Sequence, residues 1–388
     1  MGIKRETGIY RLSTTAGEQV RAFIPKPLPP DPPVDLLALY PLLDKANQAL
    51  GRLDGSTAVL PNPDIFLYFY IRKEAVISSQ IEGTQSTLSE LLLFEKGLET
   101  GVSSIDDLKE TSNYVAAMEY GLRRLRKGFP ISLRLIREIH GVLLRAGRGT
   151  DKTPGEFRRS QNWIGGSRPG NALFVPPPPD AMMECLDAFE KYLYDNRLPL
   201  LVKLGLIHAQ FETIHPFLDG NGRLGRLLLT LLLCDCQVLR QPMLYLSLYL
   251  KANRNQYYDL LQKVRTEGTW EAWLKFFLEG VAQTADQACD TAARLLHIFR
   301  KDGEKIRKLG RTAGLATQVH IYLQANPICP IREIAKEISR TIPAVTSALK
   351  RLDELGIVTE ITGKKRSRIF VYKRCLSLVG AGTEPIKN

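Results

Sequence analysis

Long apolar runs and targeting signals are missing from this chain of 388 residues. The longest apolar run, from Leu227 to Cys234, is interrupted by Asp235 and is far too short to span a bilayer. No apolar segment follows the opening Met1–Lys4, which argues against a signal peptide. Glu6 stands where a myristoylation motif requires Ser or Thr. The sequence therefore predicts a protein without membrane attachment.

Paired cysteines are missing as well. The six cysteines are scattered, and none belongs to a CxxC pair. In a chain of this length, such usage is typical of buried thiols in a reducing cytoplasm and argues against a zinc site. Hydrophobic residues make up 44% and charged residues 24% of the sequence, so we expect an ordinary soluble globular protein with room for two or three domains.

Positive charge is in excess. The formal net charge is +12, which fits either a nucleic-acid partner or a solvated basic surface. From Thr312 to the end, twelve Lys/Arg stand against six Asp/Glu, so this segment carries +6, half of the excess. The C-terminal segment is therefore the more basic part of the chain.

Apolar periodicity predicts a mainly α-helical chain. The proline-rich stretch up to Asp35 predicts an extended arm or linker, because proline cannot donate a hydrogen bond inside a helix. Glycine and proline punctuate residues 150–179, which predicts a β-hairpin or loop. A segment that is apolar on all sides, 223–239, predicts a buried helix. The other predicted helices cover residues 35–53, 64–83, 86–98, 106–127, 132–146, 180–197, 200–214, 257–267 and 270–300.

The pattern changes from about residue 313. Three short helical segments precede an alternating stretch around a Gly-Lys-Lys turn, which is the outline of a winged helix-turn-helix. Such a domain binds DNA, or serves as a dimerisation or target-docking module. If it binds DNA, affinity should fall steeply with salt. The residues expected to face the groove are Thr341, Thr346, Lys350 and Arg351, and the expected wing is Lys364–Arg368.

The stretch HPFLDGNGRLGR, from His215 to Arg226, concentrates residues suited to phosphate chemistry. Its Gly-Asn-Gly segment can point successive backbone N–H groups into one concavity at the start of a helix, which favours a bound anion. Arg223 and Arg226 flank the same mouth. Asp219 offers an oxygen ligand to Mg²⁺, and His215 can accept a proton at neutral pH. The alternative is a plain turn capped by its His and Asp, but the combination favours phosphoryl or nucleotidyl transfer, although the GxxxxGK[ST] motif is absent.

The same stretch closely resembles the signature of the Fic (filamentation induced by cAMP) family, HPFxDGNGRxxR, at all nine fixed positions. The resemblance covers about residues 30–290. It implies an all-helical protein that transfers AMP from ATP to a hydroxyl side chain of a target protein and releases pyrophosphate. Relatives also transfer UMP, phosphocholine or phosphate, but the second arginine favours ATP. A winged-helix tail is common in one bacterial branch, whose members often form homodimers.

The resemblance implies a role for each residue of the motif. His215 would be the general base, Asp219 would bind Mg²⁺, and Arg226 would pair with the γ-phosphate. Phe217 would anchor the loop in the core. The hairpin around Trp163–Val175 would be the flap that holds the target by strand-like pairing. The ATP-binding residues implied are Glu82, Thr213, Leu218, Asp219, Gly220, Asn221, Gly222, Arg223, Leu224, Arg226 and Asn255.

Other candidates have a plainer interpretation. Tyr257 and Tyr258, beside Asn255, are more often core residues than nucleotide contacts. Trp163 would either contact the target or pack the flap. His208 and His215 lack a third metal ligand. The remaining histidines, expected in the core or on the surface, are His140, His297 and His320.

The segment SSQIEG, from Ser78 to Gly83, resembles the inhibitory motif [S/T]xxxE[G/N] of the same family. By itself it is typical of a surface helix end. Ser78 and Glu82 are four residues apart and share one helix face. The resemblance implies that Glu82 pairs with Arg226 and occupies the place of the γ-phosphate, so that the enzyme rests in an inhibited state.

We therefore expect a mainly α-helical core with a β-hairpin flap, followed by a winged helix-turn-helix. The predicted parts are an N-terminal helical region (1–110) with the inhibitory motif, a Fic catalytic core (111–290), a basic connector (291–312) and the winged domain (313–388). The main functional hypothesis is an autoinhibited protein adenylyltransferase in the cytoplasm. The alternatives are a DNA-binding transcriptional regulator that uses the Fic domain as a nucleotide sensor, and a Fic enzyme that transfers another phosphate-containing group.

Overall fold

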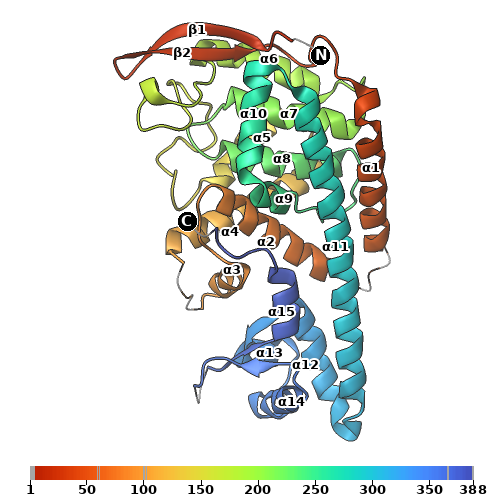
Figure 1. Cartoon of the computed structure of the whole chain (residues 1–388). Coiled ribbons are helices and arrows are strands. Elements are labelled where there is room, and N and C mark those ends of the chain that lie inside the picture. The colour runs from red at the N-terminus through yellow and green to blue at the C-terminus, as the bar shows by residue number, and fades with distance from the viewer. Residues whose placement is uncertain are drawn as a thin grey trace.

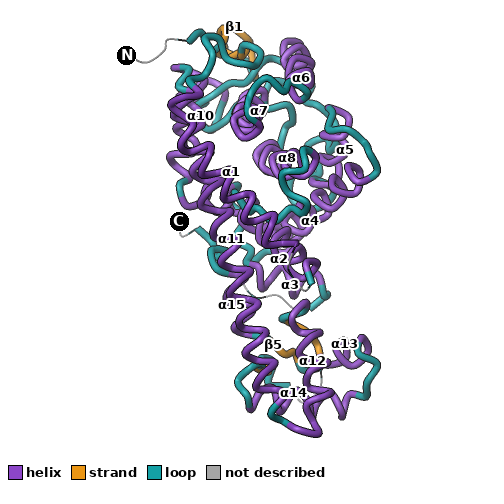
Figure 2. Tube along the Cα trace, turned by 90° about the vertical axis from the view of Figure 1, so that its right-hand side faces the viewer, coloured by secondary structure: helices purple, strands orange, loops and turns teal. Residues whose placement is uncertain are grey.

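The computed structural model describes residues 5–58, 60, 62–98, 101, 103–364 and 367–386. It is mainly α-helical, as the apolar periodicity predicts. A larger helical body and a smaller C-terminal domain are joined by one long helix, α11 (Trp270–Arg307), which runs along both (Figures 1 and 2). No helix within the described residues combines the length and apolarity needed to cross a membrane.

The first described residues form a β-hairpin, so the predicted extended arm is wrong for residues 8–25. Strand β1 (Gly8–Thr15) pairs antiparallel with β2 (Glu18–Pro25). Val20, Ala22 and Phe23 of β2 are buried, and the prolines that follow directed the prediction toward an extended arm. The Phe23 amide donates to the Val175 carbonyl (2.9 Å), so the hairpin also supports the predicted flap.

The larger body packs its helices around α8 (Asn221–Asp235), whose leucines are buried on all sides, as expected for this segment. Helix α1 (Leu36–Ala58) packs along α11. The surrounding helices are α2 (Pro63–Ile81), α3 (Leu88–Glu95), α4 (Ile105–Arg126), α5 (Leu133–Leu143), α6 (Pro179–Leu193), α7 (Leu200–Ile214), α9 (Ser247–Ala252) and α10 (Arg254–Glu267).

The segment between α5 and α6 is a loop with one strand-like contact. Ile164 and Phe174 form an isolated antiparallel bridge, and the 3-10 turn η1 (Pro169–Asn171) lies at its tip. Trp163 is partly buried against Val20, Ala22 and Val175, so it packs onto the N-terminal hairpin. Residues 163–175, which contain the bridge and the turn, form the flap that the sequence predicts.

The C-terminal domain has the predicted three helices and hairpin. Its sheet has the antiparallel order β3-β5-β4, and the predictions missed β3 and the final helix α15. Its elements are η2 (Gly310–Thr312), α12 (Ala313–Ala325), β3 (Ile328–Pro330), α13 (Ile331–Glu337), α14 (Ile342–Glu354), β4 (Thr359–Glu360), β5 (Ile369–Val371) and α15 (Lys373–Gly380).

Helix α11 continues through most of the segment predicted as a basic connector. The buried residues Asp302 and Ile306 are four apart, which is the spacing of one helix face. Basic residues occupy the exposed side of that helix, so the charge that suggested a linker marks a solvated helix face. The proposed division at residue 290 therefore falls within a continuous helix.

Candidate active site

The turn between α7 and α8 is fixed by its own side chains. His215 ends α7 in the left-handed conformation, with φ of 50°. The Asn221 amide group accepts from the Phe217 N–H (2.9 Å) and donates to the Phe217 carbonyl (2.8 Å). The Phe217 side chain is fully buried and stacks on His140 with ring centroids 3.7 Å apart. Phe217 thus anchors the loop, as the motif implies, and Asn221 uses its side chain for the loop itself.

The start of α8 forms an anion site. Gly220 precedes the helix with φ of 78°, which glycine adopts without strain. The first N–H groups of a helix have no intrahelical acceptor and favour negative charge. Arg223 and Arg226 follow on this helix, and both are buried. The sequence therefore places backbone donors and two guanidinium groups around one concavity.

Glu82 occupies this anion site. It caps the end of α2, and its Oε1 lies 2.6 Å from a terminal nitrogen of Arg226. A Cβ atom on Gly222 would lie only 2.2 Å from that Oε1, so the carboxylate lies directly on the first turn of α8. Gly83 leaves α2 with φ of 104°, which a glycine provides.

Arg226 is held from α2 by Ser78 as well. Its Nε donates to the Ser78 hydroxyl and a terminal nitrogen donates to the Ser78 carbonyl, both at 2.9 Å. Burial by itself would lower the pKa of the Arg226 guanidinium, but Glu82 and the neighbouring Tyr257 hold it above its usual value. The predicted members of the inhibitory motif thus lie together around one buried, charged arginine.

His215 lines two cavities that meet at Glu82. The larger, of about 580 Å³, lies between the flap, the start of α8 and α10. The smaller, of about 280 Å³, includes the loop residues Leu218, Asp219, Gly220 and Asn221. Burial, together with Arg265 and Arg158, lowers the pKa of His215 to about 3. The imidazole is therefore neutral at pH 7, which is the form that accepts a proton.

Asp219 has the chemistry of a ligand for a hard cation. Its side chain is 40% exposed, and Oδ1 accepts from the Gly220 N–H (2.6 Å) and from Arg223 (3.3 Å). Within the described residues no group of three metal-ligating side chains gathers. A site with one carboxylate fits Mg²⁺, which takes its remaining ligands from water and substrate phosphates. The Nε2 of His208 is hydrogen-bonded to the Tyr257 hydroxyl (2.8 Å).

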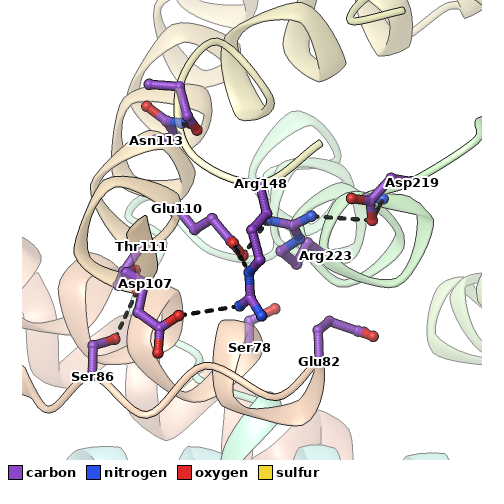
Figure 3. Close-up of polar contacts among 12 residues, drawn as sticks. Ser78, Glu82, Ser86, Asp107, Glu110, Thr111, Asn113, Arg148, Asp219 and Arg223 are labelled. Carbon is purple, nitrogen blue, oxygen red and sulfur yellow. Dashed lines mark hydrogen bonds and ion pairs between the residues drawn. The ribbon is translucent and has the colours of Figure 1, made fainter. Parts of the chain in front are cut away.

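Arg223 belongs to a polar cluster that the sequence did not reveal. Glu110 of α4 is buried and pairs with Arg223 (3.1 Å) and with Arg148. Arg148 also reaches Asp107 (3.2 Å), as Figure 3 shows. These partners are far apart in the sequence, so no local pattern indicates them.

Three of the predicted ATP-binding residues lie away from the cavities. Thr213 donates to the Ala209 carbonyl (2.7 Å) and accepts from Arg265 (3.2 Å), so it is buried behind the site. Leu224 is a fully buried core residue. Asn255 is exposed and, within the described part of the chain, lines neither cavity.

Several residues of α10 line the larger cavity, and of these only Tyr257 and Tyr258 were considered from the sequence, with the core favoured for both. All but Asp259 follow the three-to-four residue spacing of one helix face, which the sequence could have revealed. Tyr258 is partly exposed at this cavity, whereas Tyr257 borders it from a fully buried position. The set is Arg254, Tyr257, Tyr258, Asp259, Leu261, Gln262 and Arg265.

Glu212 is another cavity residue that the sequence did not indicate. It is 7% exposed, and its Oε1 has no hydrogen-bond partner within the described residues. Burial raises the pKa of its carboxyl to about 7, against the opposing effect of Arg226.

The remaining histidines lie where expected. His140 is buried beneath the loop and accepts from the Gly155 N–H (2.9 Å). His320 is buried in the C-terminal domain, and His297 is exposed on α11.

Comparison with known families confirms the resemblance. Residues 40–123 match the model "Fic/DOC family N-terminal", residues 130–233 match "Fic/DOC family", and residues 317–359 match "Winged helix-turn-helix DNA-binding".

Curated relatives carry the name "Protein adenylyltransferase Fic". The relative from Drosophila grimshawi is 31% identical over 248 residues, which are 63% of this chain and 47% of the relative. The relative from Aedes aegypti is 31% identical over 265 residues, which are 66% of this chain and 48% of the relative. The chain therefore spans about half the length of the curated relatives it matches.

Solved structures share the fold. A Fic family protein from Desulfovibrio desulfuricans G20 matches with a TM-score of 0.57 at 18% identity, over 88% of this chain and 97% of that chain. Fic-1 (aa134–508) from C. elegans matches with a TM-score of 0.50 at 22% identity, over 68% of this chain and 75% of that chain.

Proposed function

Because the chain carries a Fic/DOC N-terminal domain and a Fic/DOC domain, we propose that it is a protein adenylyltransferase. It would transfer AMP from ATP to a hydroxyl side chain of a target protein. The relatives of that name support this reaction. The observation that carries the proposal is that His215 shares a cavity with the anion site at the start of α8.

The chain's own residues fit the chemistry of this transfer. Neutral His215 accepts the proton of the target hydroxyl, and the oxygen attacks the α-phosphorus of ATP. The bond from that phosphorus to the bridging oxygen breaks, and pyrophosphate leaves. Arg226 and the first amides of α8 neutralise the phosphates. The negative charge of the bound phosphates would also raise the pKa of His215 toward a value useful for a base.

Asp219 is the residue that would hold Mg²⁺. The ion would supply neutralisation of phosphate charge next to the reacting group. The flap is the part of the chain we expect to hold the target segment, because Ile164 and Phe174 already adopt strand-like pairing at the cavity edge.

Glu82 would keep the enzyme inhibited. Its carboxylate contacts Arg226 and covers Gly222, the two places where a γ-phosphate would be bound. One arginine cannot serve a carboxylate and a phosphate in the same space. Productive ATP binding therefore requires Glu82 to move.

Intact-protein mass spectrometry after incubation with ATP and Mg²⁺ tests the reaction. We expect self-modification with the added mass of AMP minus water, and more of it in Glu82→Gly. A phosphate adduct would contradict AMP transfer. Labelled ATP in a cell lysate, with Glu82→Gly as the enzyme, would then identify the target.

A second candidate function is duplex DNA binding by the winged domain. Thr341 and Lys350 are exposed at α14, while the Thr346 hydroxyl accepts from Arg368 (3.1 Å). Lys365 and Arg366 of the predicted wing lie outside the described residues. We expect the protein to shift duplex DNA in a gel, and the shift should weaken steeply with salt. An absent or salt-independent shift would contradict DNA binding. A salt-sensitive shift would also keep open the role of a regulator that uses the Fic domain as a sensor.

The expected compartment is the cytoplasm, and the expected assembly is a homodimer. All six cysteines carry free thiols, which supports the reducing cytoplasm expected from the sequence. A homodimer is expected from the resemblance alone, and light scattering on the purified protein tests it.

A further inference from the structure

Gln80 lies between Ser78 and Glu82, which both contact Arg226, but its side chain makes different contacts. It is 1% exposed. Its Nε2 donates to the carbonyls of Ser86 and Thr383, both at 2.8 Å, and its Oε1 accepts from Lys251 Nζ (2.6 Å). A residue from the far C-terminus therefore completes the hydrogen bonding of a buried amide in the inhibitory segment.

The C-terminal residues that reach Gln80, 381–384, are here called the tail. Lys251 of α9 donates to the tail carbonyls of Gly382 (3.1 Å) and Glu384. Thr383 is 4% exposed, and its hydroxyl donates to the Gly380 carbonyl (2.7 Å). The tail is thus folded and bonded, with its backbone facing the end of α2.

Gly382 fits this place closely. It has a φ of 85°, and a Cβ atom there would lie 2.6 Å from a methyl carbon of Leu248 on α9. A side chain at 382 would therefore strain the backbone and press on the Leu248 side chain, which weakens the fit of the tail against α9.

The tail is the end of a larger contact between the winged domain and the inhibitory region. Helix α15, which leads into the tail, packs on α2, α3 and α11, and rises from the winged domain toward α2 in Figure 1. Lys96 at the end of α3 forms an ion pair with Glu333 of α13. The winged domain thus contacts the region that carries Glu82.

We propose that the tail is a latch that holds the end of α2 where Glu82 covers Gly222, with Gln80 as the positioning residue. Release of the tail leaves Gln80 with one acceptor fewer and removes two carbonyl partners from the Lys251 ammonium group. Buried polar groups without partners destabilise the arrangement that contains them. Glu82 is two residues from Gln80, so its carboxylate is then no longer held against the first turn of α8. The regulatory role rests on the proposed function, but the latch itself does not.

Gly382→Ala in the full chain tests the latch without ATP. Hydrogen exchange of the amides of residues 79–84 should be at least about tenfold faster, the change expected from the loss of one hydrogen bond to a charged group. Gly356→Ala is the matched control, since it has a φ of 67° in the same domain and open space around its Cβ. Exchange that is equal in the two variants would overturn the latch.

Gln80→Met provides a second variant, because it keeps the length of the side chain and removes its polar atoms. It should give the same faster exchange at residues 79–84, while amides of the buried helix α8 stay protected. Faster exchange in α8 to the same extent would mean general unfolding and would also contradict the proposal.

Transfer activity connects the latch to Glu82. Gly382→Ala should raise self-adenylylation, but it should add nothing in a Glu82→Gly background, because the latch acts through that glutamate. A further rise in the double variant would contradict this route. If Glu82→Gly itself transfers no AMP, the proposed function fails, and the exchange measurements still decide whether the latch exists.

Discussion

The catalytic loop and the inhibitory segment meet at Arg226, but they are held in different ways. The loop is fixed from within by the two Asn221–Phe217 hydrogen bonds, and from outside by Arg158, whose Nε donates to the His215 carbonyl (2.9 Å). Glu82, by contrast, has a side chain that is 35% exposed and reaches Arg226 through one carboxylate oxygen. The residues proposed to carry out transfer are therefore preorganised, and Glu82, the group proposed to block them, is the removable part.

The partial exposure of the Glu82–Arg226 ion pair limits the free energy by which it can favour an inhibited state. Removing one partner of a fully buried ion pair costs roughly 3–5 kcal/mol, but this pair is partly open to water and is screened. A phosphate that replaces the carboxylate also restores the partner of Arg226. We therefore expect the inhibited state to be favoured but readily displaced.

The largest effect should come from removal of the proposed general base, His215. His215→Ala should lower transfer by about 10²-fold to 10⁴-fold, the usual contribution of a positioned base. ATP affinity should stay the same, because His215 acts on the incoming hydroxyl. Mass spectrometry measures transfer and calorimetry measures binding, with the exposed His297→Ala as control. Loss of ATP binding in His215→Ala would contradict the assigned role.

The opposite effect is expected from the inhibitory segment. Glu82→Gly should raise self-adenylylation by about tenfold or more, since removal of the carboxylate frees Arg226 for the γ-phosphate. Glu82→Gln keeps the shape and removes the charge, so it should give a smaller rise. Initial rates at fixed ATP and Mg²⁺ measure both. Lower activity in a folded Glu82→Gly protein would mean that the segment is a helix end without an inhibitory role.

A third variant tests the expected cation site. Asp219→Asn can still accept from the Gly220 N–H, so the loop should keep its conformation. Transfer should fall by roughly 10²-fold, because a bound cation contributes several kcal/mol to the transition state, and extra Mg²⁺ should restore it poorly. Transfer rates across a Mg²⁺ titration give the answer. Wild-type activity at low Mg²⁺ would exclude Asp219 as the ligand.

The smallest effect concerns stability, and two asparagine variants measure it. Asn221→Ala should lower the free energy of unfolding by about 1–3 kcal/mol, because it leaves buried backbone groups of Phe217 without partners. Asn255→Ala, at an exposed position, should change it by less than about 0.5 kcal/mol. Urea denaturation measures both. A raised KM for ATP in Asn255→Ala would show that this residue does contribute to ATP binding, as expected from the sequence.

Local patterns predicted most of the fold. Helix α7 begins and ends at the predicted residues 200 and 214, and the winged domain has the predicted three helices. The N-terminal hairpin was missed because its strands lack a clear alternation of buried and exposed residues and precede a run of prolines. The helical continuation of α11 into the predicted connector was not expected, because charge on one face of a helix resembles charge in a linker.

The site was predictable where its residues are contiguous. Residues of HPFLDGNGRLGR lie together because one turn and one helix place them. Thr213 and Leu224 are close in sequence to the site but point into the core, since neighbouring helical residues face different directions. Glu110 and Arg148 could not be found locally, because their pairing joins α4 to a loop 38 residues later.

The continuity of α11 has a practical consequence for dividing the protein. Its 38 residues form a rod of about 57 Å, at about 1.5 Å per residue, and the predicted boundary at 290 falls within it. A fragment that starts after that boundary would carry a helix without its first half. A fragment that ends there would leave α2 and α3 without the partners they have in α15. Studies of residues 1–290 alone would therefore describe a protein in which α2, the helix that leads to Glu82, has lost part of its support.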